Sequence, residues 1–365
     1  MTSSSEFVSQ GHPDRTCDSI ASYILDEYLR HDPKTRFAME VQMKDKICNL
    51  AGEVTSHWHP TEDWIAELVR EAIRKVGYTA EYASKWPDCA TLNAEHVVVN
   101  NFIGQQSPNI AQGVDREGWG DQGCFMGMAT NEKEYGYMPR DKYFANAIGT
   151  SLYKAALSGE AKIGLDIKVL VSIKDEHLIE QVVVAAPMTV MNSIMAKGFI
   201  KGVVDSIAER HDYKVNELIV NGTGSYVIHS TVGDAGVVGR KLAVDFYGLN
   251  CPIGGGTTWG KDGTKADVTL NLYARYRSLK TMLERKGVFQ KVFTKIGCCI
   301  GQSKCLVAQF DQDGDLFNEE TINIIPSETI KLFGLDGSVP GMFWSLCENG
   351  LFHHIDEIAL NQSEK

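Results

Sequence analysis

At 365 residues, 43% of them apolar, the chain is long enough for two or three domains and can bury a sizeable core. Its formal net charge of −11 argues against a general nucleic-acid binder, because such proteins need broad basic patches to displace counterions from phosphates. No apolar run reaches the length of a membrane span, and residues 1–6 do not resemble a signal peptide. The composition predicts a cytoplasmic protein without membrane or nucleic-acid partners.

The first hundred residues show clear hydrophobic periodicity. Ile20, Ile24 and Tyr28 recur every four positions, as on the buried face of a helix. Apolar and polar side chains then alternate over residues 36–44, which predicts a strand with Glu40 on its outer face.

Residues 101–123 are rich in Gly, Gln, Ser, Asn and Pro and lack apolar periodicity, which is typical of a functional loop and predicts a mobile lid. The other periodic segments mix strands and helices without regular βαβ alternation and favour the α+β class. They are strands at 47–54, 165–173, 181–186, 218–220, 226–229, 242–247, 291–300 and 304–309, and helices at 61–76, 141–157, 191–211, from 265 onward and 327–333.

The nine cysteines are odd in number and scattered from Cys17 to Cys347. Even the closest group, Cys298, Cys299 and Cys305, has neither CxxC spacing nor a matching pair of histidines. The pattern predicts reduced, mostly buried thiols.

The strongest local signal for chemistry is the glycine-rich stretch 254–267. Its glycines let the backbone approach an anion, while Lys261, Lys265 and the positive N-terminal end of the following helix attract it. Asp267, in the first turn of that helix, is well placed to hold a cation that bridges to phosphate. The alternative is a flexible turn with solvated charges.

Two familiar motifs fit incompletely. Residues 255–261 match the start of a P-loop, but Asp262 stands where Ser or Thr must ligate magnesium, so a P-loop NTPase is not expected. Residues 311–315 resemble a calcium loop, but glycine falls at the fourth position rather than the sixth, so they predict a hairpin turn.

Three further groups of polar side chains suit phosphate or metal, although each alone is also typical of a helix cap or of surface charge. The first precedes the first helix, the second shares the polar face of a predicted strand, and the third follows glycines ahead of another strand. They are His12 with Asp14 and Arg15, Asp166 with Lys168, and Asp234 with Arg240 and Lys241.

Taken together, these segments resemble the methionine adenosyltransferase (S-adenosylmethionine synthetase) family. Five uncommon strings occur in that family's order, over roughly residues 6–276. They are SQGHPD at 9–14, GQQSP at 104–108, GDQG at 120–123, ATNE at 129–132 and the glycine-rich stretch 254–267.

The resemblance implies that methionine sulfur attacks C5′ of ATP and expels tripolyphosphate, which is then hydrolysed to pyrophosphate and phosphate. A thioether has no proton to lose, so this chemistry needs no activating base, and the sequence shows no catalytic triad. It depends on aligning sulfur with C5′ and on neutralising the leaving group. The resemblance also implies two Mg²⁺ ions per site, which act without proton transfer, and K⁺.

The resemblance implies a role for each matching position. Catalytic contacts to the phosphate chain would come from His12, Lys168, Arg240, Lys241 and Lys261. ATP would also contact Asp166, Ser225, Tyr226, Asp234 and Thr257. Methionine would be bound by Glu53, Gln106, Asp121, Asp234 and Lys265. Asp14 and Asp267 resemble magnesium ligands, and Glu40 resembles the potassium ligand.

The implied fold is three similar α+β units about a pseudo-threefold axis, in a homodimer or homotetramer with active sites at the subunit interface. The units would span residues 1–102, 120–233 and 234–365, and residues 103–119 would form a gating loop.

The chain departs from the family pattern around the adenine and lid positions, although every charged metal and phosphate position is kept. Two alternatives therefore stay open: a divergent relative with altered amino-acid or nucleotide specificity or mainly tripolyphosphatase activity, and a non-catalytic nucleotide-binding regulatory relative. The departures are Arg15 for Lys, Ser225-Tyr226 for Arg-Phe, Ile253 for His, Thr257-Thr258-Trp259 for Ala-Phe-Ser, Val268-Thr269 for Arg-Ser, and a short segment between Asp115 and Gly120.

Overall fold

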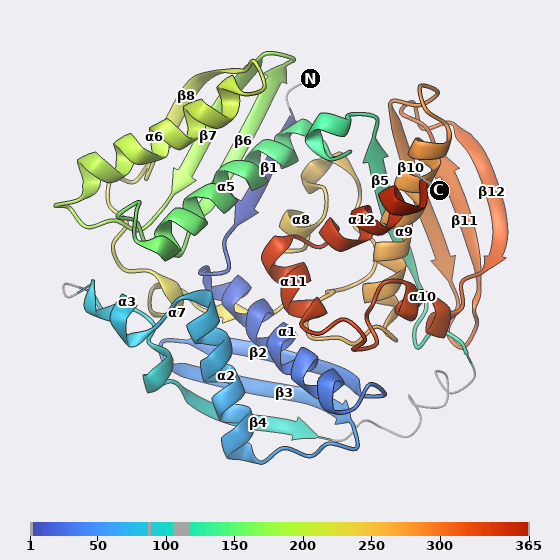
Figure 1. Ribbon diagram of the computed structural model, residues 1–365, viewed down its shortest axis with the longest axis horizontal. Helices are drawn as coiled ribbons and strands as arrows, with labels where there is room; N and C mark the ends of the chain where they lie inside the picture. Colours follow the sequence, from blue (N-terminus) through green and yellow to red (C-terminus); the bar gives the residue numbers. More distant parts are fainter. Residues whose placement is uncertain (1–2, 87–88, 105–116, 364–365) are drawn as a thin grey trace.

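The computed structural model describes residues 3–86, 89–104 and 117–363 of the chain. Three four-stranded sheets surround a central region that holds the short helices α8 (Leu242–Asp245) and α11 (Met342–Asn349) (Figure 1). Each sheet packs against its own helices. The α+β class is confirmed, with three similar units about a pseudo-threefold axis.

The first unit lies at the bottom of Figure 1 and has the strand order β4-β3-β2-β9. Its elements are α1 (Pro13–His31), β2 (Arg36–Lys44), β3 (Ile47–Thr55), α2 (Glu62–Val76), β4 (Val98–Gly104) and β9 (Gly236–Val237). β2 is antiparallel to β3 and β9, whereas β4 runs parallel to β3. Burial alternates along β2, so one face packs under the helices and the other exposes Glu40, as predicted.

Helix α2 begins and ends where the sequence predicts. The Thr61 hydroxyl accepts a hydrogen bond of 3.2 Å from the N–H of Trp64, which satisfies one of the free donors of the first turn. Gly77 ends the helix in a left-handed conformation at φ +108°, which favours glycine.

The second unit has the strand order β1-β6-β7-β8. Its elements are β1 (Ser3–Val8), α5 (Arg140–Ser158), β6 (Lys168–Asp175), β7 (Leu178–Ala185), α6 (Ser193–Glu209) and β8 (Lys214–Val220). The N-terminal strand β1 is antiparallel to β6, so the first residues of the chain belong to a sheet whose other strands come much later (Figure 1).

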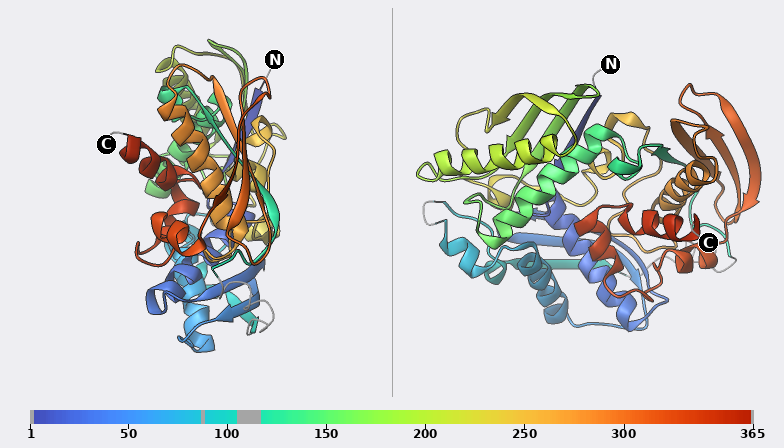
Figure 2. Two further views of the ribbon diagram at one scale, coloured as in Figure 1. Left: turned by 90° about the vertical axis from the view of Figure 1, so that its right-hand side faces the viewer. Right: turned by 45° about the horizontal axis from the view of Figure 1, so that its top comes forward.

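The third unit is an antiparallel sheet of order β12-β11-β10-β5. Its elements are β5 (Gly123–Thr130), α9 (Ala266–Glu284), β10 (Lys291–Cys298), β11 (Lys304–Phe310), β12 (Leu316–Asn323), α10 (Pro326–Leu332) and α12 (His353–Ser363). Seen edge-on, the orange and red helices lie on one side of the orange sheet (Figure 2, left). The predicted hairpin turn is confirmed, because the N–H of Asp311 donates to the carbonyl of Asp315 at 3.1 Å between β11 and β12.

The sheets do not follow contiguous segments of the chain. β1 joins the unit of β6 to β8, β9 joins that of β2 to β4, and β5 joins that of β10 to β12. Strands are thus exchanged across the expected ranges 1–102, 120–233 and 234–365, and those domain boundaries stay a proposal.

Two predicted strands are wrong, because short apolar runs do not distinguish a strand from other structure. Residues 226–229 form no strand, and the apolar run at 242–247 begins as α8. β6 begins only at Lys168, so Asp166 precedes the strand and is buried instead of lying on its polar face.

Several elements have no counterpart among the predicted ones. β4 occupies the start of the predicted loop 101–123 as far as Gly104, and residues 105–116 of that loop lie outside the described residues. The chain also continues beyond α10 into α11 and α12. The remaining short elements are α3 (Ala80–Ser84), α7 (Ser230–Gly233) and 3₁₀ turns at Ala94–His96, Lys133–Tyr135 and Gly248–Asn250.

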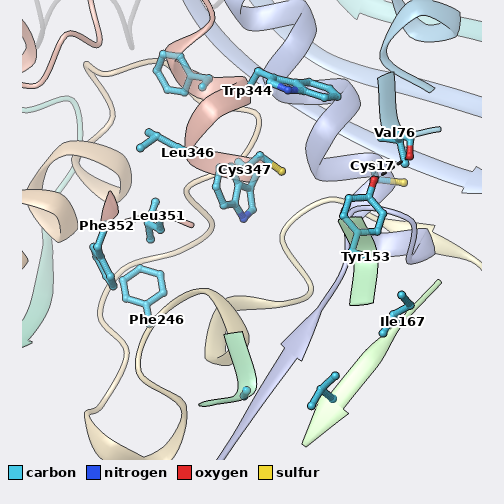
Figure 3. Packing of buried hydrophobic residues seen from close by; sticks show 14 of the residues in the cluster. Cys17, Val76, Tyr153, Ile167, Phe246, Trp344, Leu346, Cys347, Leu351 and Phe352 are labelled. Carbon is cyan, nitrogen blue, oxygen red and sulfur yellow. Dashed lines mark hydrogen bonds between the residues drawn. The ribbon is translucent and has the colours of Figure 1, made fainter. Parts of the chain in front are cut away.

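One large core runs between the units. The Tyr153 hydroxyl of α5 donates a hydrogen bond of 2.8 Å to the carbonyl of Val76 at the end of α2, which joins the second unit to the first (Figure 3). Phe246 and Phe352 pack edge to face beside α11. All nine cysteines are free thiols, and Cys17, Cys48, Cys251, Cys305 and Cys347 are buried. No helix in the described part of the chain is both long and apolar enough to cross a membrane.

Candidate functional site

His12 and Asp14 form the N-terminal turn of α1. His12 is the N-cap residue, and its Nδ1 accepts a hydrogen bond of 3.1 Å from the N–H of Asp14, while Pro13 occupies the first helical turn. Gly11 permits a close approach to the neighbouring unit, because a Cβ there would lie 2.3 Å from the carbonyl oxygen of Leu165. The turn is therefore a helix cap, as one sequence interpretation held, and it also aims two polar side chains at a basic loop.

Asp14 is the buried centre of a cluster of positive groups. One carboxylate oxygen accepts a hydrogen bond of 2.9 Å from the N–H of Val237, and the other is in an ion pair with Lys241. Arg240 lies 3.7 Å from the same carboxylate. Burial alone would raise the pKa of Asp14, but the bonds from Lys241 and Val237 outweigh it and hold the pKa below its usual range. Asp14 is therefore ionised at neutral pH.

His12 is neutral at pH 7. Burial, followed by the nearby charges of Lys168 and Lys241, lowers the pKa of His12 to about 3. Its Nδ1 is an acceptor toward Asp14, so the proton of the neutral ring sits on Nε2. His12 thus offers a hydrogen-bond donor without a charge, beside Lys168 at the start of β6.

A second cluster lies in the glycine-rich loop and the first turn of α9. Lys261 Nζ lies 2.5 Å from one carboxylate oxygen of Asp267, and the N–H of Gly256 donates to the other at 2.8 Å. Gly255 has φ +71°, and a Cβ there would lie 2.7 Å from the same carboxylate. The loop therefore wraps closely around one ion pair, and only glycine permits that path.

A cavity of about 190 Å³ opens on the outer face of the first sheet. It brings together Glu40 of β2, Glu53 of β3 and Lys261, whose backbone bridges to Ala38. Gly52 also lines it, at φ +144°, and a side chain there would collide with the carbonyl of Ala38 at 2.2 Å. Two carboxylates and one lysine from separate segments thus share one hollow.

A third group surrounds Asp166. Its carboxylate accepts a hydrogen bond of 3.1 Å from the N–H of Ser230. Burial raises the pKa of Asp166 to about 6, opposed by Tyr226, Ser230 and Lys168 and reinforced by Asp234. Burial followed by the charge of Asp166 also raises the pKa of Tyr226. The structure therefore gathers these candidate ATP contacts at one place.

The remaining predicted residues have mostly local contacts. Thr257 accepts a hydrogen bond of 3.1 Å from the N–H of Trp259, and Lys265 is the N-cap residue of α9. Asp121 is exposed, and its side chain accepts from the N–H of Gln122. Ser225 is exposed. Gln106 lies outside the described residues.

The two candidate magnesium ligands, Asp14 and Asp267, lie in separate clusters. In the described ranges, no group of three or more His, Cys, Asp or Glu side chains is placed to hold a metal ion. Asp14 and Asp267 each supply one carboxylate, which suits Mg²⁺, because that ion usually takes one or two protein carboxylates and completes its shell with water and substrate phosphate.

Asp245 and Trp259 are buried residues that no sequence pattern indicates, and together with Arg15 they lie between the two ion pairs. Arg15 lies 2.6 Å from Asp245, and the same carboxylate accepts a hydrogen bond of 2.7 Å from the indole N–H of Trp259. The available signal was that Arg15 and Trp259 both differ from the residues that the resemblance implies at these positions.

Comparison with known proteins gives matches over most of the chain. Residues 1–108 match the family model of the S-adenosylmethionine synthetase N-terminal domain, and residues 228–333 match that of the C-terminal domain. The chain is 34% identical over 324 residues to S-adenosylmethionine synthase 2 of Rhodospirillum rubrum, covering 85% of this chain and 79% of that protein. It is 33% identical over 331 residues to the S-adenosylmethionine synthase of Sulfurovum sp. strain NBC37-1, covering 87% and 82%.

A solved structure described as an unusual S-adenosylmethionine synthetase from Campylobacter jejuni matches with a TM-score of 0.85 and 27% sequence identity. The match covers 100% of this chain and 98% of that one. The likeness therefore extends through the C-terminal region, well beyond the limit near residue 276 that the sequence strings indicate.

Proposed function

The chain belongs to the S-adenosylmethionine synthetase family, and on that premise we propose that it is a methionine adenosyltransferase that acts on ATP and L-methionine. In the proposed reaction a lone pair of the methionine sulfur forms a bond to C5′, while the C5′–O bond breaks and its electrons stay on tripolyphosphate. Water then divides tripolyphosphate into pyrophosphate and phosphate at the same site.

The observation that carries the proposal is the pairing of the two candidate magnesium ligands with two candidate phosphate ligands. Asp14 is paired with Lys241, and Asp267 with Lys261. When a polyphosphate binds, we infer that each lysine turns to a phosphate oxygen and leaves its carboxylate free for Mg²⁺. Bound magnesium would neutralise charge on the leaving group without proton transfer.

His12 is suited to hydrogen-bond the phosphate oxygen on which negative charge develops as tripolyphosphate leaves. The neutral ring can donate a hydrogen bond from Nε2 to a phosphate oxygen. Unlike Lys241 and Lys261, it does not first have to leave an ion pair with a carboxylate. Lys168 and Arg240, both exposed, would add positive charge as the triphosphate departs. Removal of one preorganised donor of this kind costs about 3 to 4 kcal/mol of transition-state stabilisation.

The cavity on the first sheet suits two further cations. Glu40 and Glu53 face it together with Lys261, so a carboxylate is available for K⁺ and another for the methionine ammonium group. Both roles remain proposals for this chain.

We also propose a homodimer or homotetramer with the site at a subunit interface. The outer face of the first sheet carries exposed apolar side chains next to the cavity: Phe102 is 68% exposed, Val98 47% and Ile47 36%. A second copy placed there would cover these side chains and would enclose Glu40 and Glu53.

The proposal is tested by incubating the protein with ATP, L-methionine, Mg²⁺ and K⁺ and analysing the products by mass. We expect the sulfonium product together with equal amounts of pyrophosphate and phosphate. Phosphate release from added tripolyphosphate without any sulfonium product would instead support a tripolyphosphatase. That alternative is motivated by Tyr226 and by residues 257–259, which alter the expected adenine surround.

A further inference from the structure

Arg15, Asp245 and Trp259 form a buried contact between the two ion pairs of the candidate site, called here the clamp. The Arg15 guanidinium lies 2.6 Å from one oxygen of Asp245, and the Trp259 indole N–H donates to the other at 2.7 Å. The guanidinium also lies over the Trp259 ring, 5.3 Å from its centroid. All three side chains are less than 10% exposed, with Trp259 at 1%.

Each clamp residue is a close neighbour of a candidate site residue. The arginine directly follows Asp14 in the first turn of α1. The backbone N–H of the clamp aspartate donates to the carbonyl of Lys241 at 2.9 Å, across the single turn of α8. The tryptophan stands two residues before Lys261. The clamp therefore ties both candidate phosphate-binding segments to α1.

The two segments also touch beside the clamp. Asp18 of α1 accepts a hydrogen bond of 2.8 Å from the N–H of Gly239 and lies 3.2 Å from the clamp arginine. Gly239 has φ +78°, and a Cβ there would lie 2.6 Å from the side chain of Thr257. Glycine is therefore needed at this contact, where the loop of Arg240 meets the glycine-rich loop.

The side-chain chemistry of Arg15 and Trp259 suits this contact in ways that a lysine and a serine would not. A lysine lacks the planar fork that bonds a carboxylate and stacks on a ring. A serine is too short to fill the buried space or to replace the indole ring. Arg15 and Trp259 contact each other and the same carboxylate, so the three side chains form one unit.

We propose that Arg15, Asp245 and Trp259 act as positioning residues that fix the segments 239–241 and 254–261 relative to each other, and so hold Lys241 and Lys261 in place for polyphosphate binding. The assignment of a polyphosphate to these lysines rests on the proposed function. The fixed spacing itself rests on the contacts above.

The test compares two clamp variants with a matched control. Trp259→Phe keeps a ring in the buried space and removes the N–H that donates to Asp245. Arg15→Lys keeps the positive charge and removes the planar guanidinium group. Tyr153→Phe is the control, because it also removes one hydrogen bond from a buried ring, the bond of 2.8 Å to the Val76 carbonyl, between α5 and α2. Thermal unfolding confirms that each variant is folded.

Two readouts do not depend on turnover. Amide hydrogen exchange should become about fivefold faster or more in residues 236–245 and 254–261 of either clamp variant, and should stay unchanged there in the control. Calorimetry with Mg²⁺ and inorganic tripolyphosphate should show a dissociation constant about tenfold larger in the clamp variants, because a small displacement of the binding groups weakens binding strongly. With ATP and methionine, kcat should fall by a similar factor.

The outcomes separate the clamp from the proposed function. Faster exchange and weaker tripolyphosphate binding in a protein that forms no sulfonium product would support the clamp and reject the adenosyltransferase. Unchanged exchange in both segments, or exchange that rises equally in Tyr153→Phe, would overturn the clamp even in an active enzyme. A wild-type protein that does not bind tripolyphosphate would overturn the polyphosphate role of the two lysines, whereas the exchange data alone decide whether the clamp fixes the two segments.

Discussion

Lys261 Nζ lies 2.5 Å from a carboxylate oxygen of Asp267, so a candidate phosphate ligand and a candidate metal ligand form an ion pair with each other. Asp14 and Lys241 repeat this relationship at the other cluster. The two pairs predict that Mg²⁺ and polyphosphate bind cooperatively. Mg²⁺ bound to the carboxylate frees the lysine for phosphate, and phosphate bound to the lysine frees the carboxylate for Mg²⁺.

The first prediction concerns this coupling. Mg²⁺ alone should bind weakly to the wild-type protein, and added tripolyphosphate should raise its affinity about tenfold or more, a coupling of about 1.4 kcal/mol. Lys261→Met should strengthen binding of Mg²⁺ alone, because Asp267 loses its ammonium partner, and should weaken tripolyphosphate binding. Calorimetric titrations with each ligand alone and with both together measure these effects. Equal Mg²⁺ affinity in wild type and variant would contradict partner exchange.

The second prediction separates turnover from stability for the same residue. Lys261→Met should lower kcat by about a hundredfold, because one charge facing the leaving group is lost. The free energy of unfolding should change by less than about 1 kcal/mol, because the ion pair is partly exposed to solvent. Urea denaturation and product formation are compared in one buffer. Unchanged turnover would remove Lys261 from the proposed site.

The third prediction concerns K⁺. Glu40→Ala should abolish any preference for K⁺ over Na⁺ in activation, because the cavity loses one of its two carboxylates. Gln42→Ala is the matched control, since Gln42 is exposed two residues further along the same strand and on the same face. Activity is measured against increasing KCl or NaCl at constant ionic strength. A retained preference in Glu40→Ala would place the monovalent cation elsewhere.

The fourth prediction concerns stability and pH at Asp26 of α1. Its carboxylate accepts hydrogen bonds of 3.0 and 2.7 Å from the N–H groups of Phe343 and Trp344, and burial raises the pKa of Asp26 to about 7. The folded state therefore binds more protons than the unfolded state between about pH 4 and 7, and this group's contribution to stability falls as the pH rises through that window.

Asp26→Asn removes this titration. The free energy of unfolding of the variant, relative to wild type, should therefore increase by about 2 kcal/mol between pH 5 and pH 8. Urea denaturation at several pH values gives the difference. A difference that stays constant with pH would show that Asp26 is ionised throughout.

Much of the secondary structure is predictable because periodicity is a local property. α1 and α2 follow from apolar residues repeated every three to four positions and from the cap at Thr61. Residues 226–229 and 242–247 are mispredicted because such short apolar runs carry no period. β1 and β5 find partners far along the chain, which no local pattern reveals.

The candidate site follows the same division. The glycine-rich loop and the turn at His12 could be recognised as strings, because each is a compact local motif. The pairing of Asp14 with Lys241 could not, since 227 positions separate them and each charge alone is typical of a protein surface. Trp259 and Asp245 were missed because their role depends on one shared contact in the interior.

The exchange of strands among the three sheets has a consequence for synthesis on the ribosome. Ser3–Val8 emerges first but pairs with Lys168–Asp175, and the first sheet gains its last strand only when Gly236–Val237 has been made. No sheet can therefore be completed from an early fragment, and non-local pairing of this kind is slow. The strand Ser3–Val8 therefore stays unpaired while more than 150 further residues are synthesised, and during that time the exposed strand is most in need of a chaperone.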